Sequence, residues 1–435
     1  MSAVARIGAV LVAVLVVVAV TFLVVRAGGG QVGLGPDETA TATSGASAPA
    51  SPSQEPSAGP SSPEEDETIA ILAEIEEQVI AIRGLPAADI GPAEIITRAE
   101  LADELVALFE EDYPPEEQER DNLALRALGL LAPDQDVADL QLELLGDQVL
   151  GFYDDNEKRM VVVSDAGLDV EARITYAHEY THALQDAAFG LDSLQTDAPG
   201  EDDRGLSRVA LIEGDATVTM LAWMFQHLEP EELQEYLFGT EIPDTSGIPS
   251  WMVAQLAFPY TDGLFWAQGL AGVDPTSPDF TAIDAAYGDP PASTEQIVHI
   301  DKWEAREAPH VVEVVDLVAA LGEGWEEVDQ TPIGEATIEI MLTHLGVSAP
   351  EAEDAAAGWG GDRAVIVNGP DGAFAVAWRL AWDSAADAAA FVDAYRIVVD
   401  GLDFPASVTA LPNGQVLVAH ASDEALLDQT VDAAN

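Results

Sequence analysis

Residues 170–188 read VEARITYAHEYTHALQDAA and contain the motif that decides the fold of this chain. We predict one helix over this stretch, ended by Gly190, because glycine commonly follows the last helical residue. His178 and His182 are four residues apart and share one helix face, so both imidazoles can reach one metal ion. Glu179 follows the first histidine and can act as general base for a metal-bound water. A random chain of this composition is expected to contain roughly 0.01 such HExxH matches, which favours a metal site over unrelated histidines.

A metal site with two histidines needs a third protein ligand, and Glu213 is the first candidate. It lies in an apolar run for which we predict a second helix over residues 206–227, reached through an acidic loop at residues 201–203. A carboxylate in such a run is costly unless it is paired or bound to metal. Asp215 is the competing ligand, or a partner that supports a ligand histidine. A surface carboxylate on an amphipathic helix is the alternative for Glu213.

Two strand-like segments precede the motif. Residues 148–153 and 159–163 flank the polar turn at residues 154–157, a pattern that predicts a β-hairpin directly before the HExxH helix.

HExxH followed by a glutamate on a later helix resembles the gluzincin branch of the zincin metallopeptidases. The stretch from Gly151 through Asp215 is also similar to a group of uncharacterised bacterial HExxH proteins with membrane anchors or signal peptides. The resemblance implies a mainly helical α+β domain in which His178, His182 and Glu213 bind Zn²⁺ and Glu179 is the base. It further implies an edge strand that pairs with the substrate backbone. The chain departs from the thermolysin pattern in the spacing to the third ligand, so no substrate pocket is carried over.

Two later motifs are candidates to complete the site. Residues 259–263 are expected to precede an aromatic helix, and residues 291–299 read PASTEQIVH. A peptidase needs a hydrogen-bond donor for the oxyanion, and the side chains of Tyr260 and His299 can both donate. The second motif can equally be a helix start, with Ser293 as N-cap and residue 296 closing a capping box.

The first 26 residues predict a transmembrane segment. Residues 7–25 are apolar or small and would span roughly 28 Å as a helix, close to the thickness of a hydrocarbon core. We favour an uncleaved signal anchor over a cleaved signal peptide, and both place the rest of the chain outside the cell membrane. Residues 27–66 are rich in Gly, Ala, Ser, Thr and Pro and predict a disordered linker.

The remaining chain predicts two folded units. Residues 67–330 hold the predicted helices and the HExxH motif, and form the metallopeptidase domain. Residues 331–435 alternate between strand and helix patterns around two hairpin turns, which predicts a small α+β accessory domain with helices on an antiparallel sheet. No catalytic constellation is visible in this second unit.

The charge balance excludes one class of partner. The chain has 16 Lys and Arg against 79 Asp and Glu, for a formal net charge of -63. Phosphate would be repelled, so we expect no nucleic-acid partner. The absence of cysteine excludes disulfides, thiolate metal ligands and a cysteine nucleophile.

The sequence thus predicts a membrane-anchored, extracytoplasmic zinc metallopeptidase acting on a protein or peptide substrate. The alternative is a non-enzymatic surface protein with a structural or vestigial zinc site and a partner-binding C-terminal domain. A third interpretation is a metal hydrolase of a non-peptide bond, because HExxH alone does not specify the substrate. The sequence leaves the oligomeric state open.

Overall fold

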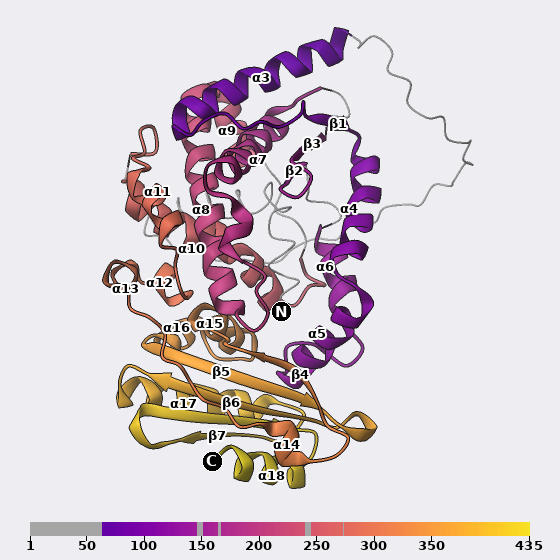
Figure 1. Ribbon diagram of the computed structural model, residues 1–435, viewed down its shortest axis with the longest axis vertical. Helices are drawn as coiled ribbons and strands as arrows, with labels where there is room; N and C mark the ends of the chain where they lie inside the picture. The colour runs from indigo at the N-terminus through magenta and orange to yellow at the C-terminus, as the bar shows by residue number, and fades with distance from the viewer. Residues whose placement is uncertain (1–62, 146–150, 164–166, 240–244, 273) are drawn as a thin grey trace, which may run out of the picture.

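A computed structural model describes residues 63–145, 151–163, 167–239, 245–272 and 274–435. Within them the protein is a mainly helical α+β molecule, with a helical part above and a C-terminal sheet below in Figure 1. The predicted membrane segment and most of the predicted linker lie outside the described residues. The described helices are α3 (Pro63–Arg83), α4 (Arg98–Asp112), α5 (Pro115–Ala127), α6 (Val137–Leu145), α7 (Val170–Phe189), α8 (Asp202–His227), α9 (Pro230–Gly239), α10 (Ser250–Ala271), α11 (Thr281–Gly288), α12 (Glu295–Val298), α13 (Ile300–Ala305), α14 (Leu317–Leu321), α15 (Glu335–His344), α16 (Ala349–Ala356), α17 (Ala385–Gly401) and α18 (Glu424–Ala434). The described strands are β1 (Glu94–Ile96), β2 (Gly151–Asp154), β3 (Arg159–Val163), β4 (Glu326–Thr331), β5 (Trp359–Asn368), β6 (Phe374–Trp382), β7 (Ala406–Ala410) and β8 (Gln415–Ala421).

Helix α7 contains the HExxH motif, as predicted, and both of its ends are fixed by the local sequence. The Asp169 side chain accepts a hydrogen bond of 2.8 Å from the backbone N–H of Ala172, which satisfies one free donor at the helix start. Gly190 ends the helix with a φ of 70°, a left-handed conformation that favours glycine. Between these caps the helix is almost entirely buried, so its histidines lie in the interior of the molecule.

The predicted hairpin is confirmed as β2 and β3, which form a three-stranded sheet with β1 in the order β1-β3-β2. Strand β1 runs parallel to β3 and was not anticipated, whereas β2 forms an edge of the sheet. The Tyr153 hydroxyl donates a 2.9 Å hydrogen bond to Asp186 near the end of α7. Lys158 in the hairpin turn forms an ion pair with the same carboxylate. These contacts fix the edge strand β2 against the HExxH helix.

Helices α8 and α10 cross at two glycines, and this crossing sets how closely they pack. A Cβ atom on Gly214 would lie 2.2 Å from the carbonyl oxygen of Gly263. A Cβ on Gly263 would lie 2.4 Å from the carbonyl oxygen of Ala210. Since no larger residue fits without moving the backbone, the two glycines bring α10 directly against the segment of α8 that carries Glu213.

Three local predictions were wrong. The acidic residues Asp202 and Asp203 do not form a loop but the first turn of α8, where the Asp203 side chain accepts hydrogen bonds from the backbone N–H and the hydroxyl of Thr294. Pro259 lies inside α10 rather than before a helix, because burial of the residues around it outweighs the backbone hydrogen bond that proline removes. Helix α12 does begin in the PASTEQIVH motif, but its N-cap is Thr294 and no side chain caps it.

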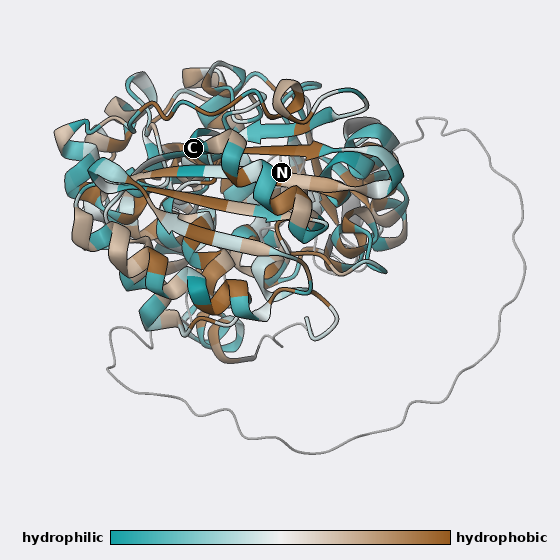
Figure 2. Ribbon diagram, turned by 90° about the horizontal axis from the view of Figure 1, so that it is seen from below, coloured by the Kyte–Doolittle hydropathy of each residue, from teal (hydrophilic) through white to brown (hydrophobic). Residues whose placement is uncertain are grey.

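The C-terminal sheet is antiparallel with the strand order β4-β5-β6-β8-β7, which confirms the predicted α+β layer. Its strands carry hydrophobic residues along much of their length (Figure 2). Alternate side chains point to opposite faces, so the sheet separates two cores. One face packs with α14 and α18, and the other packs Trp378 against Phe391 and Tyr395 of α17.

Two buried polar residues join the sheet to the helical part. Asp362 of β5 accepts hydrogen bonds from the backbone of Ile333 and Gly334 just before α15, at 2.9 and 3.0 Å. His420 of β8 donates to the carbonyl oxygen of Ala127 at the end of α5, at 2.9 Å. Burial lowers the pKa of His420 to about 4, so its ring is neutral and donates through one nitrogen only. The sheet is therefore held against α5 and α15 by oriented hydrogen bonds.

Among the described residues, no helix combines the length and the apolar character needed to cross a membrane. The predicted membrane segment at residues 7–25 is not among the described residues.

Candidate metal centre

Helices α7 and α8 pack against each other and bring together His178, His182 and Glu213. The Nε2 atom of His178 lies 3.1 Å from Oε2 of Glu213, and Nε2 of His182 lies 3.4 Å from the same oxygen. The two Nε2 atoms are 3.0 Å apart. All three side chains are buried. Two nitrogens and one carboxylate oxygen thus converge on one point in the interior.

The size of this triangle can be compared with the size that zinc requires. Ligand atoms about 2.0–2.1 Å from a tetrahedral ion lie about 3.3 Å from one another. The three separations in the protein, from 3.0 to 3.4 Å, bracket that value. The group can therefore hold a metal ion, and its geometry is consistent with an HExxH…E arrangement.

Glu179 lies beside this group with one carboxylate oxygen engaged and the other free. Its Oε2 atom accepts a 3.0 Å hydrogen bond from the backbone N–H of Tyr153 in the edge strand β2. Its Oε1 atom is buried and has no hydrogen-bond partner among the described residues. A buried carboxylate oxygen without a partner is costly. Oε1 is therefore available to accept a hydrogen bond from a ligand or a water molecule.

Burial and mutual charge set the protonation of the four groups in the absence of metal. Burial raises the pKa of Glu179 to about 8, and the charge of Glu213 adds to this shift. Burial opposes ionisation of Glu213, but the charge of His182 and the hydrogen bonds from both histidines outweigh it and lower the Glu213 pKa to about 2. Burial lowers the pKa of His178 to about 4. Glu213 is thus ionised and His178 is neutral, the forms that bind metal. Burial opposes the charged form of His182, but the charge of Glu213 and its hydrogen bond outweigh it and raise the His182 pKa to about 9, so this ring must lose a proton when metal binds.

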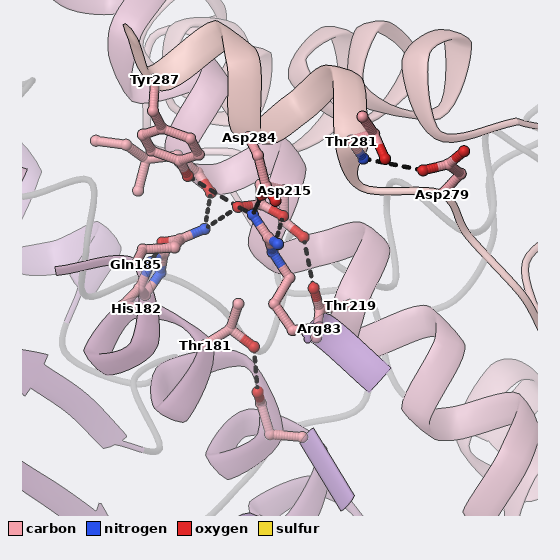
Figure 3. A network of polar contacts seen from close by, with 12 residues as sticks. Arg83, Thr181, His182, Gln185, Asp215, Thr219, Asp279, Thr281, Asp284 and Tyr287 are labelled. Atoms are coloured by element: carbon pink, nitrogen blue, oxygen red, sulfur yellow. Dashed lines mark hydrogen bonds and ion pairs between the residues drawn. The ribbon is translucent and has the colours of Figure 1, made fainter. Parts of the chain in front are cut away.

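Asp215 belongs to a separate polar network behind His182, shown in Figure 3. The Gln185 side chain accepts from His182 Nδ1 at 2.8 Å and donates to Asp215 at 2.9 Å. Asp215 also receives hydrogen bonds from Arg83 and Tyr287. Of the two roles weighed for Asp215, this arrangement favours the partner that supports a ligand histidine.

The two candidate oxyanion donors lie in different surroundings. Tyr260 of α10 is buried, with its ring centre 6.2 Å from that of His178. Burial raises the pKa of Tyr260 well above its usual value, and the charges of Glu213 and Glu179 add to this, so its hydroxyl keeps its proton. His299 is partly exposed and lies 2.8 Å from Glu335 of α15, a carboxylate outside the His178 group. The structure therefore brings Tyr260 to the candidate site, and His299 stays a sequence-based prediction.

A second cluster of carboxylates has a different explanation. Glu295, Glu307 and Asp383 place oxygen atoms close enough together to suggest a cation site. Lys302 lies among them, 3.2 Å from Glu295 and 2.6 Å from Asp383. The ammonium group already supplies the positive charge that this cluster needs.

Three residues around the metal centre were missed by sequence reasoning: Gln185, Arg83 and Tyr153. Gln185 lies three residues after His182, on the same face of the helix, so its spacing was a usable signal. Arg83 closes α3, 132 residues before its partner Asp215, and no local pattern connects them. Tyr153 acts through its backbone N–H, which the side-chain sequence cannot reveal.

Comparison with known proteins identifies one domain and leaves the candidate metal centre outside it. Residues 320–429 match a family described as a domain of unknown function (DUF8575). This range contains the five strands of the C-terminal sheet together with α15, α16 and α17. Neither the curated proteins nor the solved structures contain a match to this chain.

Proposed function

We propose that this protein is a zinc-dependent metallopeptidase of the gluzincin type, with His178, His182 and Glu213 as the zinc ligands. One observation carries the proposal: a buried carboxylate, Glu179, holds a free oxygen beside a ligand triangle of the size that zinc requires. Bound zinc would supply a Lewis acid that acidifies water and polarises a carbonyl oxygen. Among the described residues the group offers three ligands, which leaves the fourth tetrahedral position for water or substrate.

The protein's own residues would transfer the proton, orient the base and stabilise the charge that develops on the substrate. Glu179 takes a proton from the attacking water through Oε1 and passes it to the leaving amine. The backbone N–H of Tyr153 holds the other carboxylate oxygen and so keeps Oε1 directed to the site. The protonated hydroxyl of Tyr260 is a donor for negative charge that develops on the carbonyl oxygen.

We also propose that the chain is held at the cell membrane by residues 7–25, with its bulk on the extracytoplasmic side. The support is the apolar run itself and the linker composition of residues 27–66. The substrate would be a protein or peptide that reaches this side of the membrane.

The non-enzymatic alternative requires a closed site. Structural zinc sites in proteins generally use four protein ligands. The group identified among the described residues contains three, together with a carboxylate whose free oxygen a structural site does not need. This observation favours the enzyme over a purely structural zinc protein.

Substitution of the proposed base tests the function. Glu179→Gln keeps the size of the side chain but removes the proton acceptor, so we expect cleavage of a peptide library to fall by about 10²–10⁴-fold. Zinc content should stay unchanged, because Glu179 is not a ligand in this proposal. Glu171→Gln on the same helix is the matched control and should cleave normally. Cleavage by the Glu179→Gln variant at the rate of the unmodified chain would refute the proposal.

A further inference from the structure

We infer that Gln185 is a positioning residue that directs Nε2 of His182 toward the metal, and that Asp215 and Arg83 hold Gln185 in turn. This inference rests on the proposed zinc site and extends it beyond the three ligands. It assigns a role to a buried glutamine, a buried carboxylate and a buried arginine, all outside the HExxH…E motif.

The orientation of the Gln185 amide is determined by its partners. Its nitrogen lies 3.0 Å from the carbonyl oxygen of Ile212 and 2.9 Å from a carboxylate oxygen of Asp215. Both of these partners can only accept, so the amide nitrogen must face them. The amide oxygen is thereby left to face Nδ1 of His182, at 2.8 Å.

This orientation decides which ring nitrogen of His182 can bind metal. An amide oxygen only accepts, so Nδ1 of His182 must carry a hydrogen. The lone pair available to a metal is then on Nε2, the atom that faces His178 and Glu213. In many metal sites a carboxylate accepts the hydrogen bond from the ligand histidine directly. Here the neutral amide of Gln185 accepts it, and the carboxylate of Asp215 holds that amide.

Asp215 is held by groups from three other helices. Two nitrogens of Arg83, at the end of α3, lie 2.8 and 3.0 Å from its carboxylate oxygens. The Tyr287 hydroxyl of α11 donates at 2.9 Å, and Gln185 of α7 completes the set. Arg83 is itself held by Asp284 at 2.6 Å (Figure 3). Its guanidinium group also lies over the ring of Phe280. The carboxylate is therefore charge-compensated and fixed in position, which fixes the amide of Gln185.

Zinc affinity of the full chain tests this inference without any measurement of cleavage. Gln185→Met keeps the length of the side chain but removes its acceptor, and we expect zinc to bind roughly 10–100-fold more weakly in competition with a chelator. Gln185→Glu keeps an acceptor for Nδ1–H, and its second oxygen, which then faces Asp215, must carry a proton. This variant should bind zinc more tightly than the Met variant. Asp215→Asn should also weaken zinc binding. Thr219→Val is the matched control, because the Thr219 hydroxyl donates to the backbone oxygen of Asp215 and not to its carboxylate.

A spectroscopic measurement separates positioning from loss of structure. In the zinc-loaded chain labelled with ¹⁵N-histidine, the Nδ1–H signal of His182 should be present in the unmodified protein and in Gln185→Glu, and lost to exchange in Gln185→Met. Equal zinc affinity in the Met variant and the unmodified chain, or an unchanged Nδ1–H signal, would overturn the inference and leave the proposed function intact. A chain that binds zinc and shows these effects but cleaves no peptide would overturn the function alone. A chain that binds no zinc would overturn both.

Discussion

Three consecutive residues of α8 serve three different partners. Glu213 faces the two histidines, Gly214 contacts α10, and Asp215 faces Arg83 and Gln185. Residues two apart in a helix point in directions about 200° apart, so one carboxylate can approach the metal while the other cannot. The choice between the two acidic residues is therefore decided by the rotation of α8 about its axis, which directs Glu213 toward the two histidines and Asp215 toward Arg83 and Gln185.

Removal of the Glu213 carboxylate should abolish tight zinc binding. Glu213→Ala deletes one of three ligands, so the loss of affinity should exceed the roughly 10–100-fold expected for a residue that only supports a ligand. The measurement is zinc per chain after dialysis against a chelator of fixed strength. Asp203→Asn, a change at another buried carboxylate of α8, should retain full zinc content. Equal zinc in Glu213→Ala and the unmodified chain would remove Glu213 from the site.

For single residues, the sequence predicts the contacts of side chains that follow a helical or strand pattern, and it misses the contacts of those that do not. The spacing of His178 and His182 places them on one face of a helix, and their convergence with Glu213 followed the prediction. The partnership of Arg83 with Asp215 depends on how α3 packs on α8, across 132 residues of sequence. No helical or strand period encodes such a contact, so only the folded structure shows it.

Among the described helices, the crossing of α8 and α10 tolerates little change. Both helices carry a glycine at the crossing, and each glycine lies against the backbone of the other helix. The crossing places Glu213 beside the helix that carries Tyr260. The position of Glu213 therefore depends on the next residue, Gly214, which has no side chain.

Gly214→Ala should consequently destabilise the protein and weaken zinc binding. The added methyl group would lie 2.2 Å from a backbone oxygen, and overpacking of this kind costs about 1–3 kcal/mol. Thermal unfolding measures the loss of stability, and chelator competition measures zinc. Gly401→Ala in α17 is the control, since no atom lies within 4 Å of the added methyl group, and alanine there should leave the protein as stable or slightly more so. Equal unfolding temperatures for Gly214→Ala and the unmodified chain would contradict this account.

Elements with strong local signals were predicted well, and elements that depend on distant pairing were not. Helix α7 forms and ends at Gly190 as its sequence indicates, and the C-terminal hairpins also form. Strand β1 has three residues and exists because it pairs with β3, which lies about 65 residues later. Strand β4 is largely polar and forms an edge beside β5. Neither short strand has an alternation strong enough to predict it.

Over the whole molecule, acidic groups greatly outnumber basic ones, and several carboxylates are buried. Burial is the largest cause that raises the pKa values of Asp203, Glu295 and Glu339 to about 7. These carboxyl groups bind a proton more tightly in the folded protein than in the unfolded chain, where they titrate near pH 4. Folding is therefore favoured while they are protonated, and this contribution is lost as the pH rises from about 4 through 7.

The unfolding temperature should accordingly be higher at pH 6 than at pH 8, at constant ionic strength. Proton uptake at pH 6 also lowers the negative charge of the folded protein and so weakens its self-repulsion, which raises the unfolding temperature further. Scanning calorimetry of the full chain across this range measures the effect. The Asp203→Asn variant should show a smaller change, because it lacks one of the titrating groups. An unfolding temperature that falls between pH 8 and pH 6 would contradict this expectation.

The chain has two lysines, Lys158 and Lys302, and each lies against carboxylates. Reagents that acylate lysine amines therefore have two side-chain targets, both engaged in ion pairs. A protease that cuts only after lysine likewise has two peptide bonds to attack, one in the β2–β3 turn and one in α13. Immobilisation or cross-linking of this protein is better directed at its carboxyl groups, which carbodiimide chemistry activates.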